Sequence, residues 1–188
     1  MTPRELEEYR ALRDTIRERG TARIWVFLAG FVAWGGLTIA ISALAALPVA
    51  TCLPLLILAV AFEAVFSLHV AVERIGRYVQ VFLEERGDPG DSIGWEHVAM
   101  AFGPPLKGTS VDPLFTVHFI VAVVLNTVPA LLAQPVPIEV AVVLGAHLLV
   151  VARILLARRA TARQRTTDLK RFRELMEESG KFKVQSSK

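Results

Sequence analysis

Four apolar blocks, each close to the length that crosses a bilayer, dominate this sequence. They occupy residues 24–46, 48–72, 114–133 and 138–157. A transmembrane helix needs about twenty apolar residues, because the hydrocarbon core is about 30 Å thick and a helix rises about 1.5 Å per residue. Such segments are helical, since each must satisfy its own backbone polar groups. We therefore expect an all-α integral membrane protein, a four-helix up-and-down bundle with four transmembrane helices.

The composition favours this interpretation over a soluble protein. Apolar residues make up 53% of the chain, whereas a soluble domain usually carries about 45–50%. The alternative is a soluble all-helical protein with fully buried helices. Four blocks of this length are rarely all helices of a soluble core, so we favour the membrane protein.

The cations predict how the chain crosses the membrane. All 21 Lys and Arg residues fall in three places, with six in residues 1–23, four in residues 74–107 and eleven in residues 153–188. The short connections around Leu47 and in residues 134–137 carry none. Short cytoplasmic loops are enriched in Lys and Arg. We therefore expect a multi-pass protein of the cell (inner) membrane, with both termini and the long middle loop cytoplasmic.

These assignments divide the chain into a membrane domain and cytosolic helical extensions. Residues 1–20 form an N-terminal amphipathic helix, residues 21–160 a four-span domain that includes the cytosolic loop 73–113, and residues 161–188 a basic helix with a disordered tail. Glycine is common where helices end, so we expect the first helix to end near Gly20 and the last near Gly180. Asp112 and Pro113 are typical of a helix start and predict the beginning of the third span.

Charge differs between the cytosolic pieces. Residues 153–188 carry eleven basic and four acidic groups, and residues 73–112 carry four basic and seven acidic groups. The basic tail is therefore expected to pair with the acidic loop or with anionic lipid headgroups. We do not expect nucleic-acid binding, because the tail has few aromatic residues and no recognisable nucleic-acid-binding fold.

Small residues recur along one side of the first span. Their spacing alternates between four and three residues, which places them on one face of a helix. Small side chains let helix backbones approach closely in lipid. We expect this face, the small-residue seam of the first span, to pack against protein rather than lipid; it consists of Ala29, Ala33, Gly36, Ala40 and Ala43.

Polar residues inside the spans fall at two depths. Glu63, His118 and Arg153 lie equally far from the outer turns when residues are counted along each helix. We expect them to form one intramembrane cluster in the inner half of the bundle. A second set lies near the middle of the membrane and consists of Thr38, Asn126 and His147.

Three interpretations of the Glu63 cluster stay open. Buried acids and imidazoles mark proton or ion relays. The structural alternative is that Arg153 neutralises Glu63 while the histidine forms a hydrogen bond between helices. A metal site is disfavoured, because the sequence has no H-E-x-x-H motif and no Cys/His spacing typical of metal ligands. We therefore assign no metal ligands and no cofactor.

The sequence carries no enzyme signature that would name a catalytic residue. It has no Gly-x-Ser-x-Gly, no P-loop and no glycine-rich dinucleotide turn after a strand. The leading hypothesis is a non-enzymatic membrane protein that self-associates or serves as a scaffold or accessory subunit of a membrane complex. Its expected partners are the lipid bilayer and a second copy or another membrane protein. The alternative is an ion or proton channel or transporter that uses the Glu63 level, and a membrane-bound lipid enzyme is less favoured.

Overall fold

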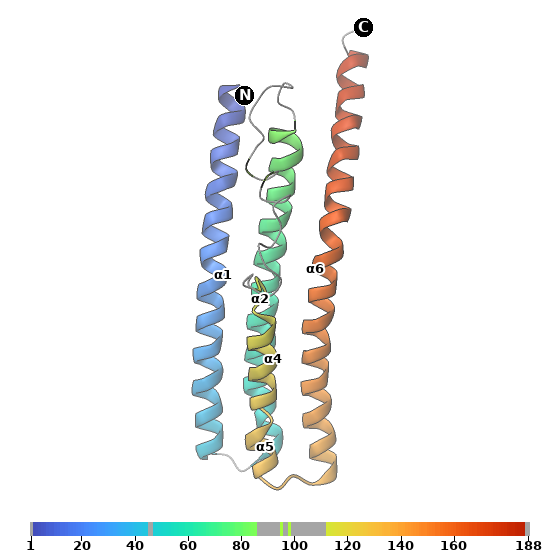
Figure 1. Cartoon of the computed structure of the whole chain (residues 1–188). Coiled ribbons are helices and arrows are strands. Elements are labelled where there is room, and N and C mark those ends of the chain that lie inside the picture. The colour runs from blue at the N-terminus through green and yellow to red at the C-terminus, as the bar shows by residue number, and fades with distance from the viewer. Residues whose placement is uncertain (1, 45–46, 86–94, 96–97, 99–111, 187–188) are drawn as a thin grey trace. The chain divides into compact units, whose positions relative to one another are not determined.

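The computed structural model describes residues 2–44, 47–85, 95, 98 and 112–186. Within these residues the protein is helical and contains no strand, which confirms the all-α class for this part of the chain (Figure 1). The elements are α1 (Pro3–Leu44), η1 (Pro48–Thr51), α2 (Cys52–Tyr78), the π-helical segment η2 (Val79–Glu84), α4 (Thr116–Leu125), α5 (Val128–Leu132) and α6 (Pro137–Ser186).

Two compact units share these helices. The first unit comprises residues 1–20, 70–111 and 161–188, and the second comprises residues 21–69 and 112–160. Helices α1, α2 and α6 each contribute a segment to both units, whereas α4 and α5 lie in the second. The predicted site residues all belong to the second unit.

Three helical segments are long and apolar enough to cross a membrane. They are Pro3–Ala43, Pro48–Glu84 and Pro137–Glu178. The third predicted span, residues 114–133, corresponds to a shorter apolar segment, Thr116–Leu132. Length and composition thus identify three of the four expected spans, and the end of the first, residues 45–46, lies outside the described residues.

The third apolar segment is interrupted between α4 and α5. Proline has no backbone N–H, so Pro129 cannot donate a hydrogen bond to the Leu125 carbonyl one turn earlier. The Thr127 amide bonds to the Val124 carbonyl at 3.1 Å, a tighter turn than that of an α-helix. The interruption places Asn126 at the end of α4, where its side chain faces the interior of the second unit.

The start of α4 differs from the prediction. The helix begins at Thr116 rather than at Pro113, and Phe115 precedes it in a left-handed conformation with φ of 50°. Asp112 still satisfies backbone donors, because its carboxylate accepts hydrogen bonds at 3.0 Å from the amides of Leu114 and Thr116. The acidic residue therefore supports the helix from one turn upstream.

The predicted helix ends at Gly20 and Gly180 are wrong. Helix α1 runs through Gly20 to Leu44, and α6 runs through Gly180 to Ser186. A glycine inside a helix costs only about 1 kcal/mol relative to alanine. That cost does not end a helix whose flanking residues continue it on both sides.

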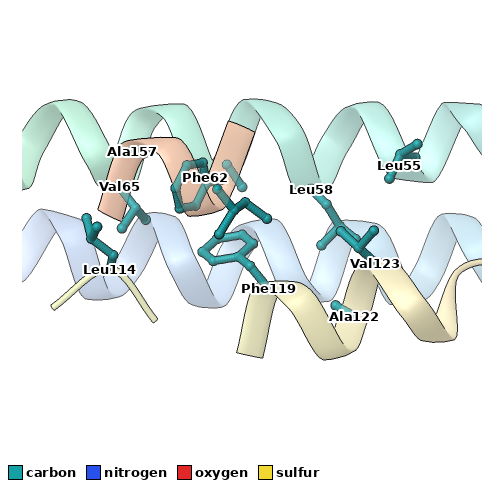
Figure 2. Packing of buried hydrophobic residues seen from close by; sticks show 11 residues of the cluster. Leu55, Leu58, Phe62, Val65, Leu114, Phe119, Ala122, Val123 and Ala157 are labelled. Carbon is teal, nitrogen blue, oxygen red and sulfur yellow. The ribbon is translucent and has the colours of Figure 1, made fainter. Parts of the chain in front are cut away.

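The core of the second unit is apolar and rich in aromatic rings (Figure 2). Phe119 of α4 meets Phe62 of α2 edge-to-face with ring centroids 5.3 Å apart, and it meets Phe31 of α1 at the same distance. Leu58 and Ile154 complete this layer with no exposed surface. The core therefore joins α1, α2, α4 and α6 through their apolar faces.

Helices α1 and α2 approach closely at Gly30. A Cβ atom added at this glycine would lie 2.4 Å from the Cβ of Ala61. Real Cβ atoms do not approach so closely, so only glycine fits here without a shift of the neighbouring helix. Gly30, which makes this close contact, lies outside the small-residue seam predicted for the first span, which is part of α1 and is called the α1 seam.

The first unit is held by an aromatic cluster and by ion pairs. Tyr78 and Phe82 stack with ring centroids 4.9 Å apart, and both meet Phe172 of α6 edge-on. Arg173 of α6 donates to the Glu85 carboxylate at 2.9 Å. Hydrogen bonding to Glu85 and its negative charge together raise the pKa of Arg173 above its ordinary value. A basic residue of α6 thus pairs with an acid that follows α2, as the charge distribution suggests.

Candidate functional site

Glu63 of α2 and Arg153 of α6 form a two-pronged ion pair. The Arg153 Nε lies 2.7 Å from Glu63 Oε1, and its Nη2 lies 2.7 Å from Oε2. The guanidinium also lies over the Phe66 ring, 5.1 Å from its centroid. Parallel N–H···O contacts of this kind fix the geometry of both groups. The carboxylate is thus neutralised within the chain.

The pair lies at the surface of the second unit rather than in its interior. The side chains of Glu63 and Arg153 are 46% and 45% exposed. Their neighbours Phe62 and Ile154 are 1% and 0% exposed. Because consecutive helical residues are about 100° apart around the axis, a helix that turns Phe62 and Ile154 inward turns Glu63 and Arg153 away from the core.

His118 does not join this pair. Its side chain is exposed, and its ring meets Phe27 and Phe115 at centroid distances of 5.8 and 6.3 Å. The next residue, Phe119, is fully buried, so His118 is rotated by about 100° from the face of α4 that meets the core. The depth count carries no information on the direction of the His118 side chain, which here lies against Phe27 and Phe115.

The mid-depth residues meet at a buried amide. The Asn126 side-chain oxygen accepts from Trp34 Nε1 at 3.0 Å and from Thr38 Oγ1 at 3.5 Å. Its nitrogen donates to the Thr51 carbonyl at 2.9 Å and lies 3.0 Å from His147 Nε2. Both donors of the amide are therefore used, and its oxygen accepts from Trp34. The Thr38 hydroxyl has one proton and also lies 2.8 Å from the Trp34 carbonyl, so its contact with Asn126 is the weaker of the two. Asn126 is 0% exposed.

The hydrogen bonds of His147 define the tautomer of its ring. Its Nδ1 lies 2.7 Å from the Val143 carbonyl and donates to it. Its Nε2 faces the Asn126 amino group and accepts from it. A ring that donates through one nitrogen and accepts through the other is neutral imidazole. The arrangement is a hydrogen-bonded network among helices.

Sequence reasoning missed two members of this network, Trp34 and Thr51. A tryptophan within an apolar helix usually finds a hydrogen-bond partner for its N–H, and that rule identifies Trp34 as a candidate. Thr51 contributes its backbone carbonyl, and no side-chain pattern reports such a contact. With them, the network links α1, η1, the end of α4, and α6.

A third polar contact, also missed from the sequence, joins α1 and α2. Arg23 Nη1 lies 3.2 Å from His69 Nδ1. His69 is 5% exposed although it lies in a long apolar stretch. A guanidinium only donates hydrogen bonds, so this ring nitrogen acts as the acceptor. The contact is a further structural link between the helices of the second unit.

The α1 seam faces outward. Each of its five residues is exposed in the second unit. A Cβ atom added at Gly36 would have no other atom within 4 Å. The seam therefore does not pack against the rest of its own chain.

Among the residues that the structure describes, no three His, Cys, Asp or Glu side chains come together in a way that could hold a metal ion. The polar groups of the second unit bind one another instead, as the Glu63–Arg153 pair and the Asn126 network do. Chemically, these groups hold helices at fixed positions.

Comparison with known proteins identified no relative: no protein-family model, no curated protein and no solved structure matches the chain.

Proposed function

We propose that this chain is a non-enzymatic multi-pass membrane protein that self-associates and acts as a scaffold or accessory subunit of a membrane complex. In this proposal four helical segments cross the cell (inner) membrane, with Thr116–Leu132 as the third crossing and both termini cytoplasmic. Three long apolar helices and large exposed apolar side chains on their surfaces support a lipid environment. The cation distribution supports the orientation.

The outward position of the α1 seam carries the proposal of self-association. Small residues favour close helix packing in lipid, and within this chain the close approach of α1 to α2 occurs at Gly30 instead. The seam leaves its small side chains and the space around Gly36 open to a helix from another molecule. In this proposal the small residues of the seam pack against a helix of a second molecule, because no helix in the described part of the same chain covers them.

The packing of the second unit disfavours the transport alternative. A relay needs polar groups in succession along the bundle. Between the Asn126 network and the Glu63 pair, the described core is filled by Leu58, Phe62 and Phe119, each at most 1% exposed. Glu63 is neutralised by Arg153 on the outside of the unit. These features support helix packing rather than conduction.

The basic end of the proposed fourth span supports contact with anionic lipid headgroups. Arg158 and Arg159 are exposed on α6, directly after the apolar block 138–157. Juxtamembrane arginines of this kind attract acidic headgroups of the cytoplasmic leaflet. Arg173, farther along, is instead paired with Glu85.

Stepwise photobleaching of single labelled molecules in liposomes tests self-association. We expect the wild type to be oligomeric and Gly36→Leu to shift it toward monomers, because a large side chain separates close helices. Gly35→Leu is the matched control, since Gly35 also has no atom within 4 Å of an added Cβ but lies off the seam. Both variants should fold as the wild type does. A wild-type chain that stays monomeric at every density would contradict the proposal.

A further inference from the structure

The Glu63–Arg153 pair lies within an exposed apolar surface of the second unit. On α2, Leu53, Leu56 and Val60 are 57%, 60% and 61% exposed. They precede Glu63 at intervals of three and four residues, so the four side chains form one stripe along the helix. The carboxylate is the charged member of an otherwise apolar stripe.

Helix α6 presents a matching surface on the other side of the pair. Leu149 and Leu156 flank Arg153 by four and three residues and are 73% and 57% exposed. The ion pair joins the two stripes directly, with two contacts of 2.7 Å. We call this surface, formed by Leu53, Leu56, Val60, Glu63, Leu149, Arg153 and Leu156, the α2–α6 face.

In the four-span arrangement proposed above, lipid chains would surround this face in an isolated molecule. Charged side chains in a membrane almost always face protein or a water-filled cavity and pair with one another. The pair uses only part of its hydrogen-bonding capacity, because a carboxylate can accept about four hydrogen bonds and a guanidinium has five N–H donors. Both side chains are nearly half-exposed, so the pair can take further hydrogen-bond partners from outside the chain.

We infer that a second copy of this chain covers the α2–α6 face, with Glu63 of each copy meeting Arg153 of the other. This inference rests on the proposed self-association and names the surface responsible for it. All copies share one orientation in a membrane, so a two-fold axis along the membrane normal brings equal depths together. Glu63 and Arg153 lie at one depth, and their charges alternate around such an axis. The face is therefore complementary to itself.

The α1 seam is a second exposed surface of the same unit. Helix α1 contacts α2 at Gly30 and Ala61, so an interface built on α2 reaches the neighbouring α1. The apolar stripes then supply contact area, the small residues allow close approach, and the four charges determine the register. In this arrangement the half-exposed ion pair lies within an apolar surface because its charges align the two copies.

Charge reversal tests the inference with two differently labelled chains. A copy with Glu63→Arg carries two cations on the face, and a copy with Arg153→Glu carries two anions. We expect each alone to associate at least about tenfold more weakly than the wild type, because like charges meet in the interface. Mixed in the same liposomes, the two should associate again, as measured by energy transfer between their labels.

Cysteine cross-linking is a second test of the interface. It does not depend on whether the charge-reversed variants fold. In a Cys52→Ala background, Val60→Cys on one chain should form a disulfide with Leu149→Cys on the other on mild oxidation, because α2 of each copy faces α6 of the other and both positions lie one turn before the ion pair. Val121→Cys on α4, which is also exposed, is the matched control and should not. If the charge-reversed chains fail to fold, the result at Val60 decides.

The outcomes separate this inference from the proposed function. An oligomeric wild type without cross-linking at Val60, or with no recovery in the mixture of folded charge-reversed chains, overturns the α2–α6 face and leaves self-association intact. A monomeric wild type overturns both. If lipid headgroups rather than a second copy cover the Glu63–Arg153 pair, no cross-link forms. That outcome would contradict the inference.

Discussion

At the scale of single residues, the Asn126 side chain connects several helices of the second unit. Its amide serves Trp34, Thr38, Thr51 and His147 from a position with no exposed surface. Removing such a group leaves several buried donors and acceptors without partners, and that loss costs more than the hydrogen bonds contribute net. The network therefore fixes how the helices meet at this level.

We predict that Asn126→Leu lowers the unfolding free energy in mixed micelles by about 1–3 kcal/mol, the cost of unsatisfied buried polar groups. Thr38→Val removes the longest contact of the amide, at 3.5 Å, together with the bond from the Thr38 hydroxyl to the Trp34 carbonyl within α1 at 2.8 Å. Because such a bond within a helix adds little stability, the substitution should cost less than about 0.5 kcal/mol. Equal stabilities for the wild type and Asn126→Leu would show that the network has no role in holding the helices.

The residue scale also shows where sequence reasoning succeeds. Glu63 and Arg153 were predicted to meet because they lie equally far along two helices that start at the same end of the bundle, and the structure places them in contact. Counting along a helix gives depth, since each residue advances by a fixed rise. It does not give rotation about the axis, and His118 therefore lies on another side of the unit.

At the scale of elements, the start of α4 depends on Asp112, outside the apolar block. Burial tends to raise the pKa of this carboxyl, but hydrogen bonds from Thr116 and Leu114 and the charge of Arg158 act in the opposite direction. The net effect lowers the pKa of Asp112 from its ordinary value of 3.8. The ionised form is thus favoured in the folded protein.

A lowered folded pKa means that Asp112 stabilises the fold above its unfolded pKa and that this contribution is lost as pH falls through the folded pKa. We predict that unfolding free energy declines on acidification below about pH 4, close to the usual pKa of aspartate. Asp112→Asn should show a shallower decline, because it has no carboxylate to protonate. Superimposable pH profiles of stability for the two proteins would disagree with this assignment.

Element boundaries show what the sequence could not provide. Gly20 and Gly180 resemble helix ends, but α1 and α6 continue through them, because local preference is weak against a long continuous helix. The third span was expected as one segment, residues 114–133, whereas the structure divides it into α4 (Thr116–Leu125) and α5 (Val128–Leu132) just before Pro129. Apolar length predicted which elements form, and packing determined where they stop.

At the scale of the whole molecule, the account depends on surfaces that the single chain leaves open. The α1 seam is outward-facing, and the Glu63–Arg153 pair is half-exposed among large apolar side chains. The sequence predicted that the seam would contact protein, but it could not show whether that protein was the same chain. The answer depends on the rotation of α1, which Gly30 and Ala61 determine through their close approach.

The central claim is that the chain crosses the membrane four times, and the segment Thr116–Leu132 is its critical test because it is shorter than the other three spans. Topology reporters fused after residues 47, 90, 135 and 188 measure this directly. The account predicts an outside signal from positions 47 and 135 and a cytoplasmic signal from positions 90 and 188. A cytoplasmic signal from position 135 would contradict it, because α4 and α5 would then not cross the membrane.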